Sequence, residues 1–108
     1  MPLDWSVVTA KYGAGYKVPT IRGGKFVNIV RVDDEAIYIE SPIWSARLQR
    51  KNLELGVELI EQGTISRDPG LFVEDYILYV AHERATSVAH ILRDLGILDQ
   101  VETFNIRC

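Results

Sequence analysis

Two runs of β-branched and aromatic residues form the clearest pattern in the first half of the chain. Residues 17–22 and 25–32 are rich in β-branched and aromatic residues, and a Gly-Gly pair separates them. Such runs are typical of strands, and a Gly-Gly pair suits the positive φ angles of a hairpin turn. After an acidic turn, residues 36–40 repeat the strand pattern. This region therefore predicts a three-stranded antiparallel meander over about residues 17–40.

Apolar residues at helical spacing predict helices on either side of this meander. Asp4 is a good N-cap for a short helix that reaches about residue 12. A second helix is expected from about Arg50 to Gly63, with its apolar positions on one face and its glutamates on the other. Residues 42–49 fit either the start of a helix or a short fourth strand, because Ser-Pro can begin a helix or close a strand.

The stretch 71–95 keeps a period of about 3.6 residues without an interrupting glycine or proline. It predicts one long helix, or two helices with a kink near residues 84–87, that ends at Gly96. A last edge strand is expected within 101–106. Together these elements predict one α+β domain over residues 1–108, with the N-terminal helix and two or three further helices packed on the sheet.

Composition supports a globular protein. Hydrophobic residues make up 47% of the chain and charged residues 25%, far from the composition of disordered chains. No apolar run approaches the length of a membrane span, so we expect a cytoplasmic protein without membrane contact. The single cysteine excludes an intrachain disulfide.

Charge is distributed unevenly, although the net charge is only −3. Residues 1–52 carry eight basic and five acidic side chains, and the rest of the chain carries four basic and ten acidic ones. Such asymmetry suits a basic binding face, and it equally suits subunits that meet through opposite charges.

The apolar residues of 71–95 exceed what one small sheet can cover. Besides the main stripe, a second flank is formed by Leu71, Phe72, Val73, Tyr76, Tyr79 and Val80. Surplus apolar surface of this kind favours self-association. The leading hypothesis is therefore a non-enzymatic accessory or interaction domain that forms a dimer or a higher homo-oligomer.

A second hypothesis is a nucleic-acid accessory protein that uses a basic hairpin. Aromatic and basic residues are interleaved there, as base stacking and phosphate neutralisation require. Strict alternation places Val27, Ile29 and Arg31 on one face of their strand. The candidate residues are Tyr12, Tyr16, Lys17, Arg22, Lys25 and Arg31.

A third hypothesis is a small-ligand site. Asp75, Tyr79 and His82 fall on one stripe if the helix is continuous, and could hold a small polar ligand. The two histidines lack carboxylates at ligand spacing, so no metal site is expected. Neither a catalytic triad order nor a nucleophile elbow is present, and we expect no enzymatic activity and no cofactor.

Residues scattered along most of the chain resemble a family of small bacterial α+β proteins without an assigned activity. The matching positions are Trp5, Val18 to Thr20, Gly24, Phe26, Arg31 to Asp33, Ile37, Arg50, Leu53, Gly63 to Ile65 and Thr86 to Leu92. The resemblance implies a compact α+β unit, sometimes accompanying DNA-processing proteins, and no catalytic residues. The chain departs from the family pattern at residues 84–88, where an Arg-Ser-Ser-Tyr-like run is expected.

Overall fold

A four-stranded sheet and four helices make up the described part of the chain. The computed structural model describes residues 3–20, 25–82 and 84–100. In chain order the elements are α1 (Trp5–Tyr12), β1 (Tyr16–Pro19), β2 (Phe26–Val32), β3 (Ala36–Glu40), β4 (Ser45–Gln49), α2 (Arg50–Glu61), α3 (Pro69–Tyr79) and α4 (Ala85–Asp94). The α+β class is confirmed, as are the short N-terminal helix and the helix that begins at Arg50.

The sheet is an antiparallel meander in the order β1-β2-β3-β4. It has one strand more than the three predicted, because residues 45–49 pair with β3. The Ser41 hydroxyl accepts hydrogen bonds from the backbone N–H groups of Ile43 and Trp44, both at 3.3 Å. Ser41 thus closes a hairpin turn rather than capping a helix, so the chain returns as a strand.

A bulge in β2 changes which residues share a face. Ile29 pairs with Ile39 but Arg31 pairs with Tyr38, so the register shifts between these two pairs. One extra residue reverses the alternation of the strand beyond it. The prediction that Arg31 shares a face with Ile29 is therefore wrong, and Arg31 lies on the opposite face of the sheet.

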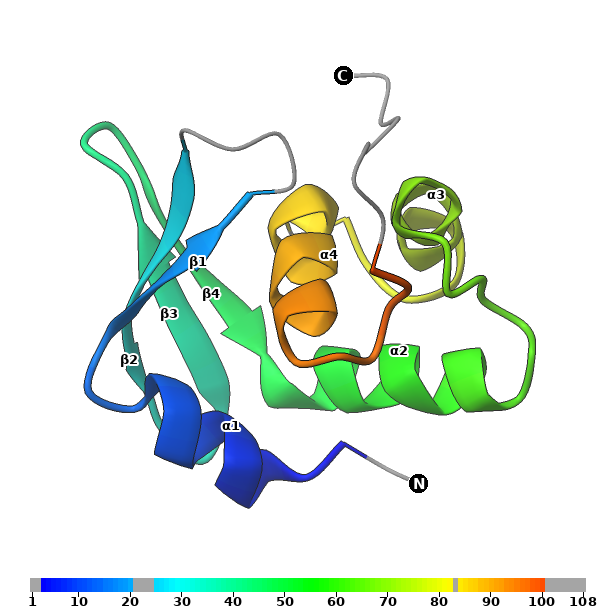
Figure 1. Cartoon of the computed structure of the whole chain (residues 1–108), viewed down its shortest axis with the longest axis horizontal. Helices are drawn as coiled ribbons and strands as arrows, with labels where there is room; N and C mark the ends of the chain where they lie inside the picture. Colours follow the sequence, from blue (N-terminus) through cyan, green and yellow to red (C-terminus); the bar gives the residue numbers. More distant parts are fainter. Residues whose placement is uncertain (1–2, 21–24, 83, 101–108) are drawn as a thin grey trace.

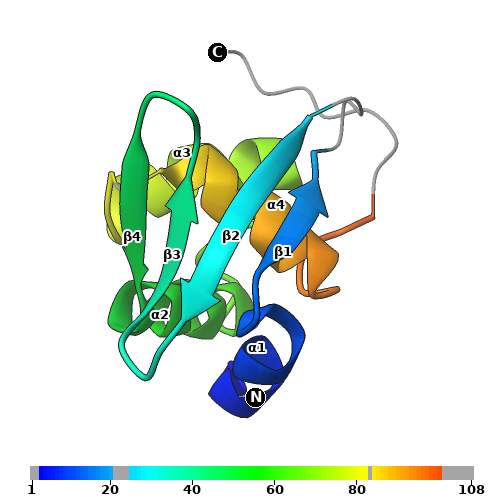
Figure 2. The same ribbon diagram turned by 90° about the vertical axis from the view of Figure 1, so that its left-hand side faces the viewer.

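The core lies between one face of the sheet and the helices. Figure 1 shows α4 between the sheet and α3, with α2 and α1 closing the lower side. The sheet contributes Val18, Val27, Ile29, Ile37, Ile39 and Leu48, all buried. The helices contribute Val8, Leu53, Phe72, Tyr76, Val88, Ile91 and Leu92. None of the described helices covers the other face of the sheet (Figure 1 and Figure 2).

The stretch 71–95 forms two helices rather than one. Helix α3 ends at Tyr79 and α4 begins at Ala85, and Arg84 between them has a φ of 45°. A right-handed helix cannot run through a residue with a left-handed backbone, so α3 and α4 are separate helices, and Arg84 is the residue directly before α4. The Arg84 guanidinium lies 3.8 Å from the ring centroid of Trp44. The expected strand at 101–106 lies outside the described residues.

Candidate functional site

One face of the sheet is not packed against the described helices (Figure 1 and Figure 2). Figure 2 views the sheet from this side, with α2, α3 and α4 behind it. The pairing register and the buried neighbours assign the outward-facing residues of the four strands. They are Lys17, Pro19, Phe26, Asn28, Val30, Arg31, Tyr38, Glu40, Ser45 and Arg47. We call this surface the open face.

Two hollows adjoin on the open face. The first, of about 500 Å³, is bounded by Arg31, Tyr38 and Arg47 among others. The second, of about 560 Å³, is bounded by Lys17, Lys25, Phe26 and residues of the β3–β4 turn. Glu40 borders both hollows. The open face therefore has two adjoining depressions, each of the size that holds a small molecule or one group of a larger ligand.

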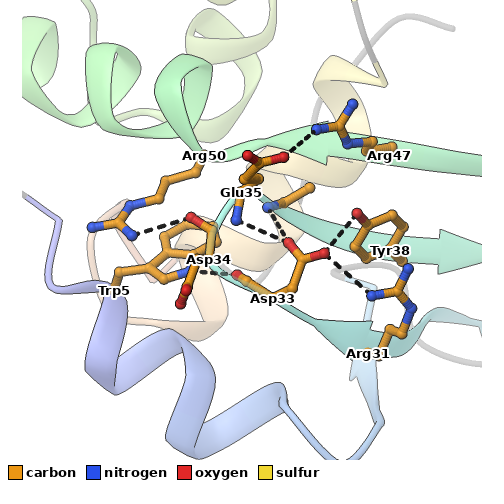
Figure 3. Close-up of polar contacts among 9 residues, drawn as sticks. Trp5, Arg31, Asp33, Asp34, Glu35, Tyr38, Arg47 and Arg50 are labelled. Carbon is orange, nitrogen blue, oxygen red and sulfur yellow. Dashed lines mark hydrogen bonds and ion pairs between the residues drawn. The ribbon is translucent and has the colours of Figure 1, made fainter.

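A row of three side chains crosses the sheet at the first hollow. Arg31 pairs with Tyr38, and Tyr38 pairs with Arg47 on the next strand. The Arg31 guanidinium lies 3.7 Å from the centroid of the Tyr38 ring. Both side chains contact Asp33, through Arg31 Nη1 at 3.2 Å and through the Tyr38 hydroxyl, which donates at 2.8 Å (Figure 3). The cation and the ring thus form one stacked unit.

Asp33 holds the turn between β2 and β3. Its Oδ1 accepts hydrogen bonds from the backbone N–H groups of Glu35 and Ala36, each at 2.9 Å. The backbone hydrogen bond from Glu35, followed by the hydroxyl of Tyr38 and with smaller help from Arg31, lowers the pKa of Asp33 from 3.8 to about 2. The carboxylate is therefore ionised at neutral pH and fixes the geometry of the Arg31–Tyr38 unit.

Two residues from distant segments anchor the same turn from outside the sheet. Trp5 donates its indole N–H to the backbone oxygen of Asp33 at 2.7 Å, and Arg50 Nη1 donates to the backbone oxygen of Asp34 at 3.1 Å (Figure 3). The Arg50 guanidinium also lies 5.2 Å from the centroid of the Trp5 ring. Helices α1 and α2 therefore both stabilise the turn that carries Asp33.

The second hollow has free cations and an exposed ring. Lys17 and Lys25 are exposed, and neither side chain forms an ion pair or a hydrogen bond with the described residues. Phe26 is 59% exposed although it lies within a strand. By contrast, Arg47 lies 3.3 Å from a carboxylate oxygen of Glu35. This end of the open face therefore offers two lysines beside an aromatic ring, and neither lysine is paired with a described residue.

The residues predicted for nucleic-acid binding are only partly brought together. Lys17, Lys25 and Arg31 do belong to the open face or its rim, whereas Arg22 lies outside the described residues. Tyr12 has no exposed surface, and its hydroxyl donates to Asp94 Oδ2 at 2.6 Å. Burial, with this hydrogen bond, raises the pKa of Tyr12. Tyr12 is therefore a core residue and cannot stack on a base.

Tyr16 lies next to Tyr12 rather than on the open face. The two ring centroids are 5.2 Å apart, and Lys11 Nζ lies 5.6 Å from each of them. Lys11 also pairs with Asp94 at 2.9 Å. This cluster joins α1 to the end of α4, so its aromatic and basic residues have a structural role. Their spacing in the sequence could not distinguish this role from ligand binding.

The sequence reasoning missed Phe26, Tyr38 and Arg47. The period-two pattern does contain a signal for the first two, because they alternate with buried residues of β2 and β3. Arg47 could not be placed, since its segment was compatible with either a helix or a strand.

The predicted stripe of Asp75, Tyr79 and His82 is interrupted. Helix α3 ends at Tyr79, so His82 lies beyond it. Asp75 Oδ2 accepts a hydrogen bond at 3.1 Å from the backbone N–H of Ser66, and thereby fastens the loop before α3. In the described ranges, no three histidine, cysteine or acidic side chains are grouped as metal ligands.

Helix α3 carries the second exposed apolar surface. Only part of the apolar flank that was predicted to be surplus is exposed, because Phe72, Val73 and Tyr76 are buried in the core. Leu71, Leu78 and Tyr79 remain 54%, 72% and 51% exposed. None of the described helices is both long and apolar enough to cross a membrane.

Comparison of the chain with protein-family models, with curated proteins and with solved structures finds no match. Any functional conclusion therefore depends on the geometry of the open face and of helix α3.

Proposed function

We propose that this protein is a non-enzymatic accessory domain that binds single-stranded nucleic acid on the open face of its sheet. The observation that carries the proposal is a combination of groups on one face: exposed Phe26, the stacked Arg31–Tyr38 unit, and the cations Lys17 and Lys25, which pair with none of the described residues. Unstacked bases are bound on aromatic rings and guanidinium planes, and lysines neutralise the phosphates between them. A four-stranded sheet presents such groups at spacings that suit two or three bases.

The shape of the surface favours a single strand over a duplex. Reading of B-form DNA needs an element that enters the major groove, usually a helix with basic residues. The exposed side of α2 instead carries Glu58 and Glu61, and α3 exposes Glu74. These carboxylates repel a phosphate backbone. The exposed carboxylates of α2 and α3 are thus unfavourable for nucleic acid, whereas the open face and its rim carry Lys17, Lys25, Arg31 and Arg47.

Fluorescence anisotropy with a labelled 12-nucleotide strand of mixed sequence, and with the matching duplex, tests the proposal. We expect the single strand to bind more tightly than the duplex at low salt. Lys17→Glu should weaken binding strongly, because it reverses a charge on the open face. Lys51→Glu is the matched control, since it makes the same change at an exposed position on α2. Absence of binding at low salt, or equal effects of the two variants, would refute the proposal.

We propose self-association through helix α3 as the second candidate function. Leu71, Leu78 and Tyr79 expose apolar surface on the outer side of the helical layer. Contiguous apolar patches on small proteins often mark protein contacts. Multi-angle light scattering at tens of micromolar decides this candidate, because a monomer at that concentration excludes a stable dimer. The two candidate surfaces lie on different layers of the molecule, so a dimer through α3 leaves the open face accessible.

A further inference from the structure

Glu40 occupies the centre of the open face and has no partner there. It is exposed, it borders both hollows, and its side chain forms no hydrogen bond or ion pair with the described residues. Its cross-strand neighbours are Asn28 on β2 and Ser45 on β4, both uncharged. Two of the three acidic residues at the β2–β3 turn differ, because Asp33 and Glu35 pair with Arg31 and Arg47. Glu40 is therefore a carboxylate that is paired with none of the described residues, although basic and aromatic side chains lie around it.

The position of Glu40 determines which part of a bound strand can lie over it. A carboxylate repels phosphates, so the phosphates must lie toward the lysines and a base must lie at the centre. Tyr38, two residues along the same strand, is roughly 7 Å away in Cα position. Phe26 is a diagonal neighbour across the strand pair, at roughly 7 to 8 Å. A base over Glu40 would therefore lie between the two stacking groups.

An ionised carboxylate only accepts hydrogen bonds. Guanine presents two parallel N–H donors on its Watson–Crick edge, and cytosine and adenine each present one amino group. Thymine and uracil present a single N–H between two carbonyl oxygens, which a carboxylate repels. Resting on the proposed function, we infer that Glu40 selects bases with an amino group, guanine most strongly, and disfavours thymine and uracil at the centre of the open face.

Guest substitution in a uniform host strand tests this inference. Nine-nucleotide thymidine strands with one central guanine, adenine, cytosine or thymine are titrated against the wild-type protein. We expect guanine to bind about tenfold more tightly than thymine, as one or two hydrogen bonds to a charged acceptor allow. Adenine and cytosine should fall between them. Equal affinities for the four guests would overturn the inference and leave the proposed function intact.

Variants separate base selection from general electrostatics. In Glu40→Gln the preference for guanine should shrink to less than about threefold, because the amide lacks the charged acceptor, while affinity for the all-thymine strand should not fall. Glu35→Gln removes the same charge at the turn, where the carboxylate pairs with Arg47, and should keep the preference. A preference that survives Glu40→Gln overturns the assignment to Glu40. Failure of every strand to bind overturns this inference and the proposed function together.

Discussion

The salt dependence of binding is the quantity that the charges of the open face determine most directly. Four cations, Lys17, Lys25, Arg31 and Arg47, lie on the open face or its rim, and two of them, Arg31 and Arg47, form ion pairs with Asp33 and Glu35. Each phosphate contact with a single strand contributes about −0.7 to the slope of log affinity against log salt. The two unpaired lysines alone give a slope of about −1.4, and all four cations give about −2.8. Between 50 and 200 mM salt, affinity should therefore fall by about 7-fold to about 50-fold.

We expect a slope nearer the lower limit, because both arginines already contact carboxylates at 3.2 and 3.3 Å. The assay is a series of anisotropy titrations with one labelled strand at four salt concentrations. Lys25→Gln should make the slope shallower by about 0.7. Phe26→Ala should leave the slope unchanged and lower affinity by about fivefold to 150-fold, since stacking contributes about 1 to 3 kcal/mol per base.

The controls distinguish loss of a contact from loss of folding. Phe26 is largely exposed, so its truncation should hardly change the melting temperature. Leu78→Ala removes an even more exposed apolar side chain from α3 and should not change affinity. A slope of zero would refute the phosphate contacts. Equal affinities of the wild type and Phe26→Ala would refute the stacking role.

Three further changes test the account of the fold and of α3. Gly56→Ala should lower the free energy of unfolding by about 1 to 2 kcal/mol in urea denaturation. A Cβ at this position would lie 2.9 Å from the buried Tyr76 ring, and the cost of overpacking outweighs the higher helix propensity of alanine. Equal or higher stability of the variant would contradict the packing. Asp33→Asn should lower the melting temperature at pH 6. The folded-state pKa of Asp33 lies below its ordinary value of 3.8, at about 2, so the ionised carboxylate stabilises the fold above about pH 4. The difference in melting temperature between the variant and the wild type should therefore shrink between pH 4 and pH 2. A difference that does not change with pH, measured by circular dichroism, would exclude the ionised form as the cause. Leu78→Lys should convert any dimer to a monomer in light scattering without changing the melting temperature, and a dimer that persists would place the contact elsewhere.

Local chemistry explains which elements could be predicted. Asp4 accepts a hydrogen bond from the backbone N–H of Ser6 at 3.0 Å and begins α1 as expected of a capping residue. The apolar face of α2 and the alternation of β2 and β3 likewise follow from nearby residues. The fourth strand and the bulge in β2 depend instead on pairing with β3. Tertiary pairing of this kind leaves little trace in a single sequence.

The candidate site was less predictable than the fold for the same reason. Spacing identified the basic hairpin, and Lys17 and Lys25 do lie at the open face. Spacing could not distinguish Tyr12, which is buried against α4, from an exposed stacking residue. It also could not join Arg31 to Tyr38, because the bulge that places them together reverses the alternation of the strand.

The most direct test of the account is an NMR titration of the ¹⁵N-labelled protein with an unlabelled single strand. We expect the largest chemical-shift changes at the backbone amides of Lys17, Phe26, Asn28, Tyr38 and Glu40, with little change in α3. Saturable changes confined to the amides of α3 or α4, with the open face unaffected, would contradict the claim that the uncovered sheet is the binding surface.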